Sequence, residues 1–188
     1  MKEKSNYKID LGDITKHNVG QLKRLNTVIF PVMYNDKFYK DVLDLGELAQ
    51  LVYFNDIIVG AVCCRVEKGG PPQNPNNTHT PLPSPGFRDK NQKKIYIMTL
   101  GCLPKYRRLG VGTVMLEHVF KLCEKFPDVE AVYLHVQLGN DSALEFYKKE
   151  GFEITNTVEG YYKRIEPSSA YVLEKVINSP KESAAASK

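Results

Sequence analysis

The pattern of hydrophobic and polar residues changes its period most clearly in the middle of the chain. Residues 95–100 form a run of mainly apolar, strand-forming side chains, which predicts a buried strand. Beyond Tyr106, two glycines, Gly110 and Gly112, precede a run in which apolar residues recur every three or four positions: Leu116, Val119, Phe120 and Cys123. This spacing predicts an amphipathic helix, so we expect a strand, a glycine-containing turn and a helix.

The N-terminal pattern predicts a strand followed by two helices. Residues 7–11 alternate in polarity, and apolar residues then recur at helical spacing up to Phe30, where Pro31 should end the helix. A second helix, capped by Asp36 and ended before Gly46, is expected to contain Phe38, Val42 and Leu43. Between the two helices lies a bent, apolar loop.

A hairpin is expected next, because two β-rich runs, 48–53 and 57–66, are separated by Asn55 and Asp56. This pair should lie beside the 95–100 strand in one antiparallel stretch of sheet. After the central helix, residues 130–136 return to a strand pattern, and Asn140 or Ser142 can cap a further helix that Gly151 ends. Two more strands are expected, at 152–154 and 170–175.

The length of 188 residues favours a single domain, here expected over residues 1–178. One segment interrupts the pattern: residues 68–93 are rich in Pro, Gly and Asn and are too long for an ordinary hairpin turn. We expect an exposed loop insertion there, although a Pro-rich ligand for a partner is an alternative. Residues 179–188 are small and polar, which predicts a disordered tail.

The two central glycines favour an anion site. Backbone N–H groups at a helix start point outward unpaired, and the helix dipole adds positive potential, which suits a pyrophosphate. A P-loop would need Lys and Ser or Thr after the second glycine, and a dinucleotide fold would need a third glycine near Met115. Neither is present, and Arg107-x-x-Gly110-x-Gly112 resembles the acetyl-coenzyme A signature of the GNAT acetyltransferases.

Composition narrows the class of protein further. The formal charge of +4 is mild and its basic residues are scattered, so direct nucleic-acid readout is not expected. The four cysteines show no Cys-x-x-Cys spacing and no histidine at metal-ligand distance, which favours reduced, buried thiols and no metal site. The N-terminus lacks an apolar signal core and no apolar run is long enough to span a bilayer, so we expect a cytoplasmic or nuclear protein without membrane association.

His135 is the most conspicuous single residue. A lone histidine in an apolar strand is more often a hydrogen-bonded core residue than a catalyst. However, the 95–100 strand is expected to be its parallel neighbour across a helical crossover, and ligands of such units collect beyond the carboxyl ends of the strands. His135 lies near that end.

A larger set of motifs, in order from about Tyr7 to Lys175, resembles the San-type N-alpha-acetyltransferases, the catalytic subunits of NatE within the GNAT superfamily. The matching segments are 30–34, 96–101, 106–112, 133–136, 140–147 with 151–152, and 161–165. Two departures stand out: the 68–93 loop is much longer than is usual in the family, and Met33 replaces a small residue.

The resemblance implies an α/β GNAT fold: a mixed central sheet of about seven strands, with helices on both faces and a splay between the fourth and fifth strands. Tyr96 and His135 would be the catalytic pair, acting through ordered water. The peptide would be held by Phe30, Pro31, Val32, Tyr34, Met98, Tyr161, Tyr162, Lys163 and Arg164. Acetyl-CoA, the cosubstrate that leaves as CoA, would be bound by Leu100, Gly101, Cys102, Leu103, Arg107, Arg108, Leu109, Gly110, Val111, Gly112, Thr113, Asn140, Ser142 and Tyr147.

These residue types suit acetyl transfer to the α-amine of peptides or nascent chains that begin with Met and an apolar residue. An α-amine has a pKa of about 7.7–8.0, so a neutral histidine without a strongly shifted pKa can help to remove its proton. Backbone donors of the fourth strand could stabilise the thioester oxyanion, and Tyr147 could protonate the leaving thiolate.

Two other functions stay open. The first is a lysine acetyltransferase on the same fold, although a lysine amine, with a pKa near 10.4, needs more help to lose its proton. The second is a CoA-binding docking subunit of a larger N-terminal acetyltransferase complex. The resemblance also implies association with the NatA catalytic and auxiliary subunits at the ribosome, and a link to sister chromatid cohesion.

Overall fold

The computed structural model describes residues 7–68 and 92–177, which form seven strands and four α-helices. The first half contains β1 (Ile9–Asp13), α1 (Val19–Ile29), α2 (Asp36–Val42), a 3₁₀ turn (Gly46–Leu48), β2 (Ala49–Phe54) and β3 (Ile57–Lys68). The second half contains β4 (Lys93–Cys102), a 3₁₀ turn (Pro104–Tyr106), α3 (Val111–Lys125), β5 (Val129–Gln137), α4 (Asp141–Lys149), β6 (Glu153–Val158) and β7 (Ala170–Val176).

The predicted insertion and tail lie almost wholly outside the described residues. Of the segment 68–93, the description includes Lys68 at the end of β3 and residues 92–93, and it includes nothing of 179–188. Lys68 and Lys93, which flank this stretch, are register partners. Among the described residues, no helix is long and apolar enough to cross a membrane.

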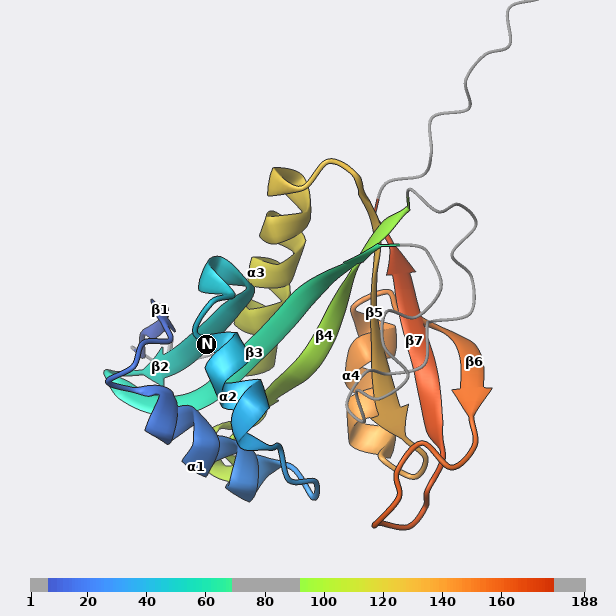
Figure 1. Ribbon diagram of the computed structural model, residues 1–188, viewed down its shortest axis with the longest axis horizontal. Coiled ribbons are helices and arrows are strands. Elements are labelled where there is room, and N and C mark those ends of the chain that lie inside the picture. Colours follow the sequence, from blue (N-terminus) through green and yellow to red (C-terminus); the bar gives the residue numbers. More distant parts are fainter. Residues whose placement is uncertain (1–6, 69–91, 178–188) are drawn as a thin grey trace, which may run out of the picture.

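All seven strands form one mixed sheet in the order β1-β2-β3-β4-β5-β7-β6. The pair β4 and β5 is parallel and the other five pairs are antiparallel. The parallel pair is joined through α3, as the sequence pattern predicted from its strand–helix–strand order. In Figure 1 these two strands lie close together at the top and diverge downward, which divides the sheet into two halves.

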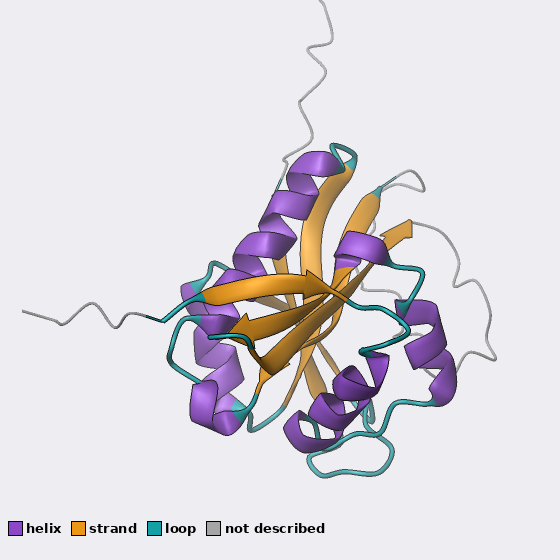
Figure 2. Ribbon diagram, turned by 90° about the vertical axis from the view of Figure 1, so that its left-hand side faces the viewer, coloured by secondary structure: helices purple, strands orange, loops and turns teal. Residues whose placement is uncertain are grey.

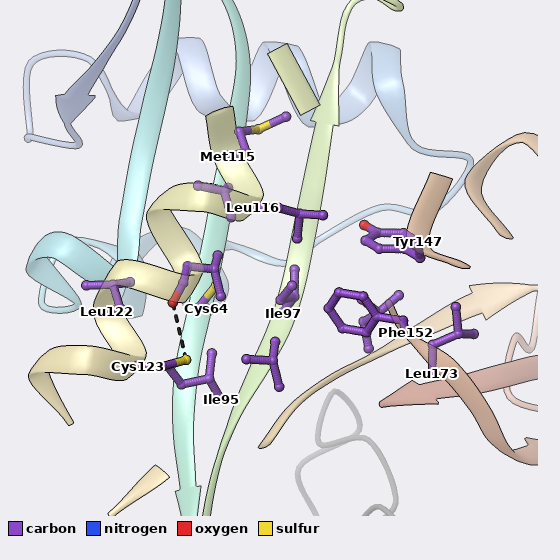
Figure 3. Packing of buried hydrophobic residues seen from close by; sticks show 14 of the residues in the cluster. Cys64, Ile95, Ile97, Met115, Leu116, Leu122, Cys123, Tyr147, Phe152 and Leu173 are labelled. Carbon is purple, nitrogen blue, oxygen red and sulfur yellow. Dashed lines mark hydrogen bonds between the residues drawn. The ribbon is translucent and has the colours of Figure 1, made fainter. Parts of the chain in front are cut away.

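Helices cover both faces of the sheet, as Figure 2 shows. Helices α1 and α2 pack on one face through a cluster that includes Leu22, Leu25, Tyr39 and Val42. On the opposite face, α3 and α4 pack on a larger cluster, part of which is drawn in Figure 3. Its labelled residues come from α3, α4, strands β3, β4 and β7, and the position just before β6: Cys64, Ile95, Ile97, Met115, Leu116, Leu122, Cys123, Tyr147, Phe152 and Leu173. The mixed sheet with helices on both faces is therefore confirmed.

Local chemistry explains most element boundaries and corrects two predictions. Asn55 and Asp56 both adopt positive φ, 46° and 67°, which forms the tight turn expected between β2 and β3. The cap of α2 is Asn35 rather than Asp36, because the Asn35 Oδ1 atom accepts the Phe38 N–H at 2.9 Å. That helix ends at Val42, so Gly46 begins a separate 3₁₀ turn.

At the C-terminal helix, Asn140 rather than Ser142 is the cap. Its Oδ1 atom accepts the Ala143 N–H at 3.3 Å. Gly151, with φ +86°, lies just beyond the end of α4, as predicted from its tolerance of the left-handed region. The predicted strand at 7–11 is shifted by two residues, to Ile9–Asp13.

The splay between β4 and β5 has a clear origin in the register. The two strands pair only from Lys93 to Tyr96 on β4, and Tyr96 opposite Tyr133 is the last pair. Just beyond it, Cys63 pairs with Thr99 and Cys64 with Ile97, so Met98 is an extra residue in β4. Such a bulge bends its strand. The bend accompanies the separation of the two strands, and the expected splay is confirmed.

Candidate active site

Tyr96 and His135 meet where β4 and β5 separate. Tyr96 belongs to the last paired position of β4, and His135 lies two residues beyond its partner Tyr133 on β5. The Tyr96 and His135 ring centroids are 5.6 Å apart, with the planes at 77°. The splay therefore brings together the two residues that the resemblance implied as a catalytic pair.

His135 is enclosed by aromatic rings. The Tyr161 ring stacks on it at 4.4 Å with an angle of 14° between the planes, and the Tyr133 ring approaches edge-on at 6.2 Å. Its Nδ1 atom is buried and has no hydrogen-bond partner among the described residues. Burial, with a smaller contribution from the charge of Arg65, lowers the pKa of His135 to about 4.

This low pKa corrects the expectation of a histidine with a nearly ordinary pKa. The imidazole stays neutral at physiological pH, so one ring nitrogen is always available to accept a proton. It is also a weaker base than a free imidazole. Because burial disfavours the charged form, His135 is suited to pass a proton onward rather than to hold it.

The Tyr96 hydroxyl shares a hydrogen bond of 3.2 Å with the Tyr161 hydroxyl. Tyr96 is buried, and desolvation together with the neighbouring Tyr161 raises its pKa well above the usual value. Tyr162 packs edge-on against Tyr161, with ring centroids 4.8 Å apart. The loop before β7 thus places Tyr161 against both Tyr96 and His135, with Tyr162 packed against Tyr161.

Three residues that sequence reasoning missed lie beside this pair. The Arg65 guanidinium is 5.0 Å from the centroid of the Tyr96 ring, and Arg65 Nε donates to Glu67 at 2.7 Å. The other Glu67 oxygen accepts a short hydrogen bond from the Tyr133 hydroxyl. A signal was available in the sequence: Arg65 and Glu67 are two charges at i and i+2 near the end of an apolar strand, hence on one face.

The loop after α1 faces the site from the other half of the sheet. Phe30 and Tyr34 make an edge contact at 6.1 Å, and Tyr34 packs on Phe38 at 4.7 Å. Burial first, and then nearby Tyr162 and Tyr161, raise the pKa of the Tyr34 phenol. Met98 packs against both the α1-side cluster and the cluster around Tyr96, so it links the two halves.

Other residues expected at the peptide site are less enclosed. Val32 is half-buried, whereas Pro31, Lys163 and Arg164 are exposed. Met33, the departure from the family pattern, is 86% exposed and so does not fill the interior of the loop.

The start of α3 fits an anionic ligand. Gly110 precedes the helix with φ +87° and no side-chain cap, and the first turn contains no acidic residue. A Cβ atom added to Gly110 would meet only Ile9, at 3.9 Å, so the backbone there is accessible. Arg107 and Arg108 are exposed beside it. Unpaired N–H groups, a helix dipole and two cations suit the pyrophosphate of acetyl-CoA.

The remaining residues of the expected cofactor stretch serve the fold as well. A Cβ on Gly112 would lie 3.0 Å from the Phe146 ring, so this glycine lets α3 approach α4 closely. Val111 and Cys102 are buried, and Leu100, Leu103, Leu109 and Thr113 are partly buried. Asn140 uses its side chain as a helix cap, and Ser142 is exposed.

Tyr147 is the buried member of this group. It packs against Phe146 and Phe152, with ring centroids 5.1 and 5.5 Å away. Burial raises its pKa, so the phenol keeps its proton. In Figure 3 its oxygen points toward β4.

Comparison with known proteins identifies the family. Residues 19–152 match the acetyltransferase (GNAT) family. The chain is 58% identical over 173 residues to N-alpha-acetyltransferase 50 of Danio rerio, which covers 92% of this chain and 91% of the relative. The chain belongs to the N-alpha-acetyltransferase 50 branch of the GNAT acetyltransferases. The probable N-acetyltransferase san of Drosophila melanogaster is 56% identical over 169 residues, covering 90% and 81% of the two chains.

Solved structures agree with this family assignment. Arabidopsis thaliana Naa50, in complex with the bisubstrate analogue CoA-Ac-MVNAL, is 44% identical and superposes with a TM-score of 0.73, covering 89% of this chain and 97% of that one. Arabidopsis thaliana NAA60, 23% identical with a TM-score of 0.73 and coverage of 91% and 99%, shares the fold. The expected GNAT fold and the San-type resemblance are both confirmed, and the chain is an N-alpha-acetyltransferase of the GNAT type.

Proposed function

We propose that this protein transfers the acetyl group of acetyl-CoA to the α-amine of peptides that begin with Met followed by an apolar residue. The observation that carries the proposal is the meeting of Tyr96, His135 and Tyr161 at the point where β4 and β5 separate. The glycine-containing start of α3 suits an anionic cofactor, and the apolar loop after α1 suits a peptide. A relative bound to an analogue named CoA-Ac-MVNAL supports both the cofactor and a peptide that starts with Met.

The cofactor is assigned to the β4–α3 segment. Backbone N–H groups at residues 110–113 would hold the pyrophosphate, with Arg107 and Arg108 adding positive charge. When bound, acetyl-CoA supplies the activated acetyl group. Backbone donors of β4 beyond the bulge are then suited to stabilise the thioester oxygen as negative charge develops on it.

The peptide N-terminus is assigned to the opposite side. Phe30, Val32 and Met98 offer an apolar pocket for an unbranched Met side chain, with about 0.8 kcal/mol gained per buried CH₂ group. The hydroxyl groups of Tyr34, Tyr161 and Tyr162 can fix the peptide backbone. Exposed Lys163 and Arg164 would contact the chain further along, and exposed Pro31 would shape the loop.

Tyr96 and His135 would then remove the amine proton through a bridging water. An α-amine with a pKa of about 7.7–8.0 is mainly protonated at neutral pH, so loss of that proton must precede attack. The neutral His135 can accept the proton, and its low pKa favours quick release to water. Tyr147, whose pKa is raised, keeps a proton that it can give to the leaving thiolate.

Direct transfer is preferred over an acetyl-cysteine intermediate. Burial raises the pKa of all four thiols, that of Cys63 to about 12 and that of Cys123 to about 11. A nucleophilic cysteine needs its thiolate, which these environments disfavour. Both substrates are therefore proposed to be bound together when the acetyl group moves.

The test is acetylation of a Met-Leu peptide by the parent protein and by Tyr96→Phe and His135→Ala. Both variants should lower kcat much more than they raise the peptide KM, because proton removal acts in the transition state. Parental rates in both variants would refute the assignment. Modification of only internal lysines on a peptide with a free Met terminus would instead favour the lysine acetyltransferase.

Binding of CoA without turnover on any peptide would favour the docking-subunit alternative. Association with NatA subunits at the ribosome, and a cytoplasmic or nuclear location, belong to the same proposal. Co-purification with those subunits from cells tests the association.

A further inference from the structure

A continuous set of polar and aromatic side chains crosses the sheet at the last pair before the splay. Arg65 on β3 is the register partner of Tyr96 on β4, and Tyr96 is the partner of Tyr133 on β5. Glu67 follows two residues after Arg65, on the same side of β3. In Figure 1 this is the region in which β3, β4 and β5 run together, above the point where β4 and β5 diverge.

Glu67 links β3 to β5 through its two carboxylate oxygens. Its Oε1 atom accepts from Arg65 Nε at 2.7 Å and lies 2.5 Å from Arg65 Nη2. Its Oε2 atom accepts from the hydroxyl of Tyr133, a fully buried residue. The side chains of Arg65 and Glu67 are only 25% and 18% exposed, so solvent screens these contacts less than it screens a surface ion pair.

The same side chains enclose the ring of Tyr96. The Arg65 guanidinium lies 5.0 Å from its centroid, and the Tyr133 ring lies 4.8 Å away with a tilt of 34°. The path from Tyr96 to Arg65, Glu67, Tyr133 and back to Tyr96 is therefore closed. Each member limits the freedom of the next, and the Tyr96 ring has a neighbour of fixed position on two sides.

We propose that Glu67 and Tyr133 are positioning residues for acetyl transfer: with Arg65 they form a clamp that fixes the Tyr96 hydroxyl toward Tyr161 and His135. This inference rests on the proposed role of Tyr96 in proton removal. The clamp explains how Tyr96 is held in place although it is the last residue of β4 that pairs with β5. Proton transfer depends steeply on geometry, so a loosened ring should slow the chemical step.

Tyr133→Phe is the sharpest perturbation, because it removes one oxygen and keeps the ring that packs on Tyr96. Glu67→Gln keeps the shape of Glu67 and removes its charge. We expect each change to lower kcat on a Met-Leu peptide about ten- to a hundredfold, with the peptide and acetyl-CoA KM values within about twofold of the parent. The matched control is Tyr171→Phe, the same substitution on β7, whose ring packs on the opposite face.

A double-mutant cycle separates positioning from general stability. In a Tyr96→Phe background there is no hydroxyl left to position, so adding Tyr133→Phe should change kcat less than about twofold. If Tyr133→Phe lowers kcat in that background by the same factor as in the parent, the clamp is wrong. Parental kcat in Tyr133→Phe with a parental melting temperature would also overturn it, as would a joint rise of both KM values with a collapsed melting temperature.

The cycle also tells failure of the clamp from failure of the proposed function. If Tyr96→Phe lowers kcat and Tyr133→Phe does not, the clamp is wrong and the role of Tyr96 stands. If Tyr96→Phe itself acetylates at the parental rate, both are wrong. Should Glu67→Gln fail to fold, Tyr133→Phe decides the question by itself.

Discussion

Gly101 offers the most direct test of how the two substrate sides are coupled, because it belongs to β4 yet touches the loop after α1. A Cβ atom added there would lie 2.6 Å from Ile29 Cγ2 and 3.1 Å from Phe30 Cζ. Real Cβ contacts are not found at 2.6 Å, so Gly101→Ala must displace the end of α1 or the Phe30 ring. The family resemblance implied a cofactor contact for Gly101, whereas this geometry predicts an effect on the peptide side.

The expected magnitude follows from two opposing terms. Overpacking a well-packed site costs about 1–3 kcal/mol, and replacing Gly with Ala returns about 0.4–1 kcal/mol by restricting the unfolded chain. The net loss of up to about 2.6 kcal/mol should lower the melting temperature by up to about 10 °C for a protein of this size. If displacement of the Phe30 ring costs about 1 kcal/mol of contact with the peptide, the peptide KM should rise about three- to tenfold.

The assay is steady-state acetylation with each substrate varied in turn, alongside thermal unfolding. Gly20→Ala is the control, because nothing lies within 4 Å of a Cβ at that exposed position of α1. It should leave both KM values unchanged and the melting temperature equal or slightly higher. A Gly101→Ala protein with a raised acetyl-CoA KM and an unchanged peptide KM would refute the reasoning.

Three further predictions concern the cofactor, the loop and pH. Gly110→Val and Gly110→Asn should both raise the acetyl-CoA KM at least about tenfold, because a side chain would block the approach of the pyrophosphate to the backbone. Asn tolerates the positive φ of this position, so the Asn variant should fold. Parental acetyl-CoA affinity in a folded Asn variant would exclude a close contact between the pyrophosphate and this backbone. Replacing residues 69–89 by a short Gly-containing turn should keep turnover within about tenfold, because the flanking strands are already paired at Lys68 and Lys93, and a larger loss in a folded protein would assign the loop to the site. Because the pKa of His135 is lowered to about 4, the folded protein binds this proton less readily than the unfolded chain, and stability is lost as the pH falls from about 6.5 to 4. In denaturant titrations over this pH range, the free energy of unfolding of the parent should fall by up to about 3 kcal/mol more than that of His135→Gln. An equal pH dependence of the two proteins would contradict the buried environment of His135.

The features that sequence predicted well are those set by nearby residues. The helix that ends before Pro31, the turn at Asn55 and Asp56, and the stop at Gly151 each depend on one or two positions whose backbone preferences are strong. The parallel pairing across α3 followed from strand–helix–strand order alone. The cap of α2 was misplaced by one residue because Asn and Asp cap equally well, and only the geometry distinguishes them.

The features that sequence did not predict depend on residues far apart in the chain. The pKa of His135 is lowered by burial under Tyr161, which arrives from a loop whose path no local pattern specifies. The contact between Glu67 and Tyr133 joins residues 66 positions apart on strands that are not neighbours in the sheet. The motif resemblance pointed to Tyr96 and His135, but the side chains around them could be identified only from the register of β3, β4 and β5.

The bulge in β4 explains how one strand serves both sides of the site. In a regular strand Tyr96 and Gly101, five positions apart, would lie on opposite faces. Here a Cβ on Gly101 would point at Ile29 and Phe30 on the α1 side, and Tyr96 lies on that same face, in contact with Met98. The extra residue Met98 shifts the alternation by one, and this shift places the side chain of Tyr96 on the face of the sheet that the peptide loop covers. Strand β4 is thus proposed to supply the Tyr96 hydroxyl, the Met98 side chain of the peptide pocket and the backbone donors for the thioester oxygen, because its regular pairing is interrupted once.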